Sequence, residues 1–66
     1  MNSREATLNF ADMMDRIRNI FDNFEDRPDV RRNLLMECER DAKTKLRESD
    51  QSYIRGYIMA REETRG

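Results

Sequence analysis

The side chains that commonly act as acids, bases or nucleophiles are scarce in this sequence. It contains no histidine, which is the commonest general base at neutral pH, and a single cysteine, Cys38. Cys38 stands among apolar residues, and burial of that kind raises the pKa of a thiol and makes it unreactive. One cysteine allows no internal disulfide, and without histidine one chain has no ligand set for a closed zinc site. We therefore predict a protein that is not an enzyme and uses no cofactor.

Carboxylates form the one cluster that suggests a metal ion. They are Asp22, Glu25, Asp26 and Asp29. A calcium-binding EF-hand loop places its ligands at alternate positions, with a glycine at the turn and a glutamate at the twelfth position. This stretch offers Pro28 and no glycine, so we interpret it as a solvent-exposed turn without a bound metal.

The segment between residues 53 and 61 has the residue types of a binding surface. Tyrosine and arginine are enriched in interface hot spots, and methionine adapts to irregular partner surfaces. An ordinary core face and a self-association face are the alternatives. Gly56 costs a helix about 1 kcal/mol relative to alanine, which suggests a close backbone approach or a bend at this point. We predict that an unidentified protein is bound through Tyr53, Arg55, Tyr57, Ile58, Met59 and Arg61.

Arginine outnumbers lysine by eleven to two, and its planar guanidinium pairs with phosphates as well as carboxylates. This bias supports an alternative function, which is nucleic-acid binding by basic strips that dimerisation joins. The residues of the strip are Arg31, Arg32, Arg40, Lys43 and Arg47. The formal net charge of -1 falls short of the basic character of a nucleic-acid-binding domain, so we rank this function second.

Interleaved acids give the same cations a simpler role. Three acid–base pairs stand four residues apart in the order that favours ion pairing along a helix. They are Asp12 with Arg16, Glu39 with Lys43, and Asp41 with Lys45. We expect most of the charged side chains to cover the solvent-facing sides of helices.

Helices are the elements that must position these residues. From Phe10 to Phe24 the apolar residues recur at alternating steps of three and four, which predicts a helix over about residues 4–25. Proline disfavours helical geometry at the residue before it but suits a first helical turn. Pro28 therefore predicts a turn at about residues 26–28 and the start of a second helix.

The second half of the chain leaves two arrangements open. We predict a second helix over about residues 28–48 and a third over about 50–63, but residues 48–52 contain no glycine or proline to force a break. An unbroken helix from Pro28 would reach about 54 Å, against about 30 Å for the first helix. Either the chain breaks near Ser49 and folds back as a three-helix bundle, or the overhang packs against another molecule.

These elements predict an all-α fold, which is an antiparallel helical hairpin with a long or broken second helix in a single domain of residues 1–66. A core in a chain of this size rarely supplies more than about 3–5 kcal/mol of stability. We therefore expect self-association into a homo-oligomer, with a dimer as the expected state. The predicted core consists of Phe10, Met13, Ile17, Ile20, Phe21 and Phe24 against Leu34, Leu35, Cys38, Ala42 and Leu46.

The function expected from these features is stoichiometric. Without catalytic residues, the chain would act as a regulator or inhibitor that covers a surface of another protein, and phage or plasmid modulators are proteins of this size class. A membrane-spanning helix needs about 20 consecutive apolar residues, and the sequence has no apolar run of near that length. Its first residues also lack the pattern of a secretory signal. We expect a cytoplasmic protein with no membrane contact.

Overall fold

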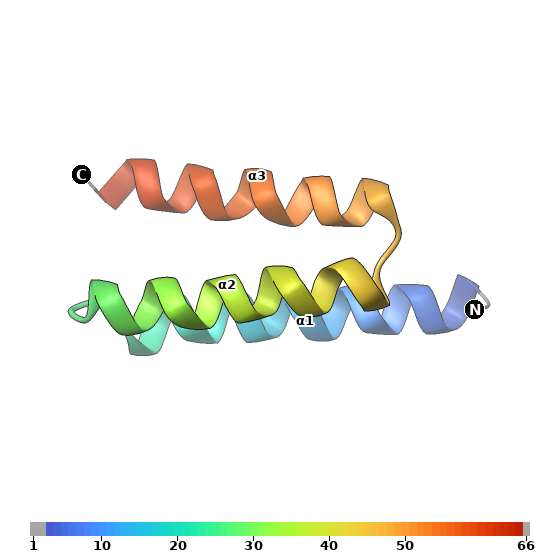
Figure 1. Ribbon diagram of the computed structural model, residues 1–66, viewed down its shortest axis with the longest axis horizontal. Coiled ribbons are helices and arrows are strands. Elements are labelled where there is room, and N and C mark those ends of the chain that lie inside the picture. The colour runs from blue at the N-terminus through green and yellow to red at the C-terminus, as the bar shows by residue number, and fades with distance from the viewer. Residues whose placement is uncertain (1–2, 66) are drawn as a thin grey trace.

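The computed structural model describes residues 3–65, with the side chains of Ser3, Ala6 and Arg65 excepted. Residues 3–65 form three helices, which are α1 (Ser3–Asn23), α2 (Pro28–Lys45) and α3 (Glu48–Arg65). No strand occurs within residues 3–65, so the predicted all-α class is confirmed. The helices lie side by side, with the α1–α2 connection at one end and the α2–α3 connection at the other (Figure 1).

The first connection follows from the proline. Arg27, which precedes it, is non-helical with φ −129° and ψ 76°, and Pro28 is the first residue of α2. The amide of Phe24 still donates to the carbonyl of Ile20 at 3.0 Å, so α1 closes just before the turn. Asp29 lies in the first turn of α2, where the helix dipole favours a carboxylate.

The second connection is a break that no glycine or proline imposes. Leu46 adopts an extended conformation, with φ −116° and ψ 152°, and its side chain is buried. Its amide donates to the carbonyl of Ala42 at 2.8 Å, and its own carbonyl accepts a hydrogen bond of 2.8 Å from the Gln51 side chain. The second helix therefore ends at Lys45, three residues before its predicted end, and α3 begins at Glu48.

All three helices contribute to one hydrophobic core. Its fully buried side chains include Phe21 and Ile17 of α1, Cys38 of α2 and Ile54 of α3. The core takes in the predicted residues of α1 and α2, of which Phe10, Phe24 and Leu34 are only partly buried. It gains three residues that the predicted core omits, which are Met14, Ile54 and Ile58. Each helix therefore buries one face, and α3 supplies part of the core.

Gly56 has a different role from the predicted one. It lies on an exposed side of the continuous helix α3, and a Cβ atom added to it would meet nothing within 4 Å. The expectation of a close backbone approach at this glycine is wrong.

The described helices also include none that is long and apolar enough to cross a membrane.

Candidate interaction surfaces

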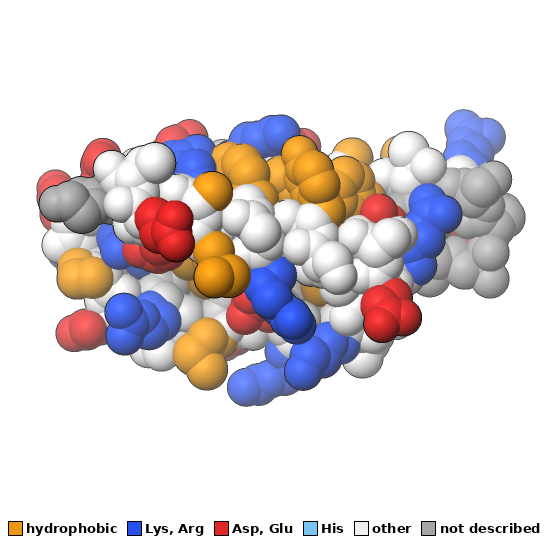
Figure 2. Space-filling model, turned by 90° about the horizontal axis from the view of Figure 1, so that it is seen from above, with side chains coloured by type: hydrophobic (Ala, Val, Ile, Leu, Met, Phe, Trp, Pro, Cys, Tyr) orange, Lys and Arg blue, Asp and Glu red, His pale blue; other side chains and the backbone are white. Residues whose placement is uncertain are grey.

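The structure divides the six predicted partner-binding residues between two sides of α3. Tyr57 and Arg61 turn toward α1, whereas Arg55 turns toward α2. Ile58 is buried in the core, at 8% exposure. Tyr53 and Met59 are exposed, at 59% and 58%. In Figure 2, which looks onto α3, hydrophobic side chains gather along one side of this helix and a group of Lys and Arg side chains lies on the other.

The side of α3 that meets α1 is aromatic. The ring of Tyr53 meets that of Phe10 edge to face, with the centroids 5.5 Å apart, and Tyr57 meets Phe21 in the same way at 6.4 Å. The guanidinium of Arg61 lies 4.7 Å from the centre of the Phe21 ring and donates a 2.9 Å hydrogen bond to the Tyr57 hydroxyl. We call this surface the aromatic edge. It holds Tyr57 and Arg61 in place, while Tyr53 remains open to solvent.

The side of α3 that meets α2 is hollowed. One hollow of about 240 Å³ is lined by Met36, Glu39, Arg40, Lys43 and Arg55. A second, of about 210 Å³, is lined by Arg32, Leu35, Met36, Glu39, Ile58 and Glu62. The two hollows share the lining residues Met36 and Glu39, so they are neighbours between α2 and α3, and we call the pair the α2/α3 groove.

The cations of this groove form no ion pair with any residue that the structure describes. Arg32, Arg40, Lys43 and Arg55 form no salt bridge within the described part of the chain, although other arginines do. The groove cations therefore come from two helices. Those of α2, which are Arg32, Arg40 and Lys43, belong to the predicted basic strip, whereas Arg55 of α3 does not. Among the other strip residues, Arg47 pairs with Asp50 at 3.2 Å.

Ion pairs within helices were predicted at three places, and the described residues form none of them. Arg16 pairs instead with Asp41 of α2, at 2.8 Å. This partner lies on the neighbouring helix, so the pair joins two elements. The lysines Lys43 and Lys45 make no salt bridge to described residues. Exposed lysine pairs gain little from being fixed in one geometry, because the entropy cost offsets a weak attraction.

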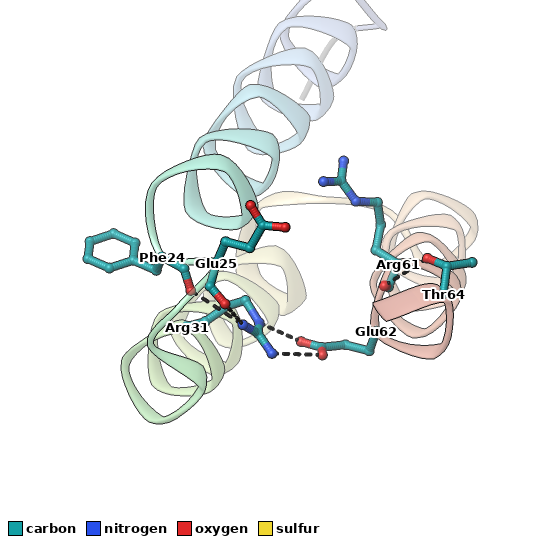
Figure 3. A network of polar contacts seen from close by, with 6 residues as sticks. All are labelled: Phe24, Glu25, Arg31, Arg61, Glu62 and Thr64. Atoms are coloured by element: carbon teal, nitrogen blue, oxygen red, sulfur yellow. Dashed lines mark hydrogen bonds and ion pairs between the residues drawn. The ribbon is translucent and has the colours of Figure 1, made fainter. Parts of the chain in front are cut away.

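Arg31 is buried, at 8% exposure, and all three of its guanidinium nitrogens donate hydrogen bonds within the chain. Nε and Nη2 bind the two carboxylate oxygens of Glu62 at 3.0 and 3.1 Å. Nη1 donates to the carbonyls of Phe24 and Glu25, which follow α1 (Figure 3). Arg31 therefore links the end of α1, the start of α2 and the last turns of α3, and its guanidinium does not face solvent with the other strip residues.

Three titratable groups have pKa values that their surroundings shift, and one of them is Arg16, whose pKa is raised by its hydrogen bond to Asp41. Burial raises the pKa of the Cys38 thiol, whose exposure is 0%. A hydrogen bond from Arg16 lowers the pKa of the Asp41 carboxyl. Cys38 lies in the middle of the core, and the neutral thiol is a packing group at neutral pH.

Among the described residues, no three His, Cys, Asp or Glu side chains are arranged to hold a metal ion. Comparison of the chain with protein-family models, curated proteins and solved structures gives no match. The candidate sites are therefore defined by the geometry of this chain alone, as the aromatic edge and the α2/α3 groove.

Proposed function

We propose that this chain is a small, non-enzymatic protein that binds another protein stoichiometrically, as a regulator or inhibitor. It acts in the cytoplasm as a self-associating three-helix bundle, with a dimer as the expected state. The observation that carries this proposal is the pair of large apolar side chains on α3, Tyr53 and Met59, that are more than half exposed. Contiguous exposed apolar surface is typical of an interaction site, and the exposed ring of Tyr53 adjoins that of the partly buried Phe10.

The neighbours of these two residues support recognition by α3. Tyr53 is oriented by the Phe10 ring, so its phenol is presented to solvent at little entropy cost. Met59 lies six residues after Tyr53 on the same helix, about 120° away around its axis, and a methionine adapts to the shape of a partner. We infer that α3 is the helix that a partner contacts.

The experiment is an affinity capture of partners from the host lysate, with identification by mass spectrometry. The variant Tyr53→Ala/Met59→Ala should lose about tenfold of the captured partner, because two exposed anchors are removed. Both side chains are mostly exposed, so its circular dichroism spectrum should stay helical. Tyr57 is left intact because it packs on Phe21.

The matched control removes two exposed apolar side chains from the other helices, Leu8 of α1 and Val30 of α2. The variant Leu8→Ala/Val30→Ala should capture the partner as the wild type does. Equal capture by wild type and both variants would show that Tyr53 and Met59 do not bind the partner. Failure of the wild type to capture any protein would contradict the proposed function itself.

Nucleic-acid binding is the second candidate, and it is favoured by Arg32, Arg40 and Lys43, which form no salt bridge with the described residues. Affinity for phosphates grows with the number of cations brought to them and falls steeply with salt. A gel shift at low salt, with protein at about micromolar concentration, tests this function. Retardation that disappears with added salt supports it, and no retardation excludes it.

A further inference from the structure

The α2/α3 groove has an apolar floor between charged walls. Leu35 and Ile58, from α2 and α3, are buried beneath it, and Met36 is 53% exposed within it. Ile58 was predicted as a partner contact, and here it forms part of the floor. A groove with this floor offers an apolar stripe to a ligand, and the flexible thioether of Met36 can adjust to the ligand's side chains.

Charge in the groove is unbalanced. The four cations Arg32, Arg40, Lys43 and Arg55 have no salt-bridge partner within the described residues, and Glu39 is the carboxylate that accompanies them. The other carboxylate of the lining, Glu62, is bound on both oxygens by Arg31. The lining therefore selects an anionic ligand.

The combination of floor and walls distinguishes between anionic ligands. A phosphate backbone would use the cations but would leave the apolar floor covered by a charged chain, with Glu39 repelling it. An amphipathic helix with an apolar stripe and flanking carboxylates satisfies both features, because the stripe covers the floor and the carboxylates reach the arginines. Arg32 and Lys43 are eleven residues apart on α2, which corresponds to about 16 Å, or three turns of a bound helix.

We propose that the α2/α3 groove binds an acidic amphipathic α-helix of a partner protein. This inference rests on the proposed function, since it names the chemistry of the partner. The apolar stripe of the helix packs on Met36, the exposed apolar side chain of the groove, and over the small exposed parts of Leu35 and Ile58. Its glutamate or aspartate side chains pair with Arg40 and Lys43 on one wall and with Arg55 on the other.

The experiment measures fluorescence anisotropy of a labelled synthetic peptide of about 18 residues, with leucines at helical spacing and glutamates beside them. One control peptide has the same composition in an order that destroys the apolar stripe. The other replaces each glutamate by lysine. The full-length protein should bind the first peptide and neither control.

Two charge variants locate the binding. The variant Arg40→Gln/Arg55→Gln removes one cation from each wall and should weaken peptide binding about tenfold, as expected for two partly exposed ion pairs. The matched control Arg4→Gln/Lys45→Gln makes the same change in net charge with exposed cations outside the groove, and should change binding by less than about twofold. Met36→Asp should abolish binding by placing a carboxylate on the floor. Thermal melts of each variant check that the fold is intact.

Four results would overturn the inference. They are equal binding of the scrambled peptide, no binding of the first peptide up to about 100 µM, tighter binding of a double-stranded oligonucleotide than of the peptide, and a lower mass of Arg40→Gln/Arg55→Gln in light scattering. The last would mean that a second copy of this chain occupies the groove. If the peptide fails while Tyr53 and Met59 still capture a protein, the groove inference falls and the proposed function stands.

Discussion

Arg31 shows how one residue can tie three helices together. A buried guanidinium is costly unless its donors are satisfied, and here every nitrogen has an acceptor. Removal of one partner from such a pair leaves the polar groups of the other unsatisfied, and this destabilises the fold. The destabilisation is larger than the stability that the pair adds relative to two apolar side chains in the same places. The main effect of the pair between Arg31 and Glu62 is therefore to specify the position of α3 on α2, and its net contribution to the free energy of unfolding is small.

The variant Arg31→Met should lower the free energy of unfolding by about 2 kcal/mol, because the carbonyls of Phe24 and Glu25 lose the donor from Arg31 and the Glu62 carboxylate loses two hydrogen bonds. Urea unfolding followed by circular dichroism measures the loss. The neighbouring Arg32→Met is the matched control, since Arg32 is exposed and has no ion pair in the described chain, and it should change stability by less than about 0.5 kcal/mol. Equal stability of Arg31→Met and wild type would contradict this role.

Asp41 gives a prediction in pH. Its pKa is lowered in the folded chain by the hydrogen bond from Arg16, so the carboxylate stabilises the fold at pH above its unfolded pKa of about 3.9. This contribution is lost as the pH falls below that value and through the lower folded pKa. The stability advantage of wild type over Asp41→Asn should therefore be present at neutral pH and vanish in acid.

Thermal melts of both proteins from neutral pH to about pH 3 measure this difference. Asp12→Asn is the control, because Asp12 forms no salt bridge with described residues although it stands four residues before Arg16. Its difference from wild type should not follow the loss of the Arg16 pair. A gap between wild type and Asp41→Asn that is constant over this range would show that the pair does not stabilise the fold.

The sequence contains part of the signal that places Arg31. It stands four, seven and eleven residues before Leu35, Cys38 and Ala42, which is the spacing of the buried face of α2. The positive charge of Arg31 predicts an exposed position instead, and Glu62, with which it pairs, lies 31 residues further along the chain. Burial of a charge depends on such a distant partner, which local periodicity does not specify.

At the scale of elements, α3 contains a glycine that lowers the stability of the helix and that a substitution can replace. Gly56 lies in the interior of the helix, on a side where an added Cβ meets nothing within 4 Å. Gly56→Ala should therefore raise the free energy of unfolding by about 1 kcal/mol, which corresponds to about 4–8 °C in the melting temperature. Ala60→Gly, at an exposed position one turn later, is the reciprocal control and should lower stability by a similar amount. Destabilisation by Gly56→Ala would show that this face of α3 is covered in the native state.

The two connections differ in how well local sequence predicts them. Pro28 acts through its own ring on the preceding residue, so the start of α2 was predictable from the sequence. The break at Leu46 has no such local cause. It depends on burial of this side chain in the core and on the hydrogen bond from Gln51, both of which exist only when α3 is in place.

At the scale of the whole molecule, the sequence identified cations and apolar residues but not their grouping. Arg40 and Arg55 are fifteen residues apart in the chain, and they line the same hollow only because α3 lies against α2. The sequence pattern predicts one binding surface over residues 53–61. The helix instead presents Tyr53 on one side and Arg55 on the other, because residues two apart point in different directions on a helix.

Cys38 reports on the opening of the whole core. Its thiol is fully buried and burial raises its pKa, so an alkylating reagent reaches the thiolate only when the chain opens. If the chain self-associates, dilution weakens the native state by mass action. We expect iodoacetamide labelling of native protein to be at least about a hundredfold slower than in denaturant, and to accelerate when the protein is diluted from about 100 µM to about 1 µM.

The control is Cys38→Ala/Ser49→Cys, whose thiol stands at an exposed position of α3 and should be labelled rapidly at every concentration. Slow labelling of the wild type that does not change on dilution would contradict self-association, because a core sealed in the single chain opens at a rate independent of concentration.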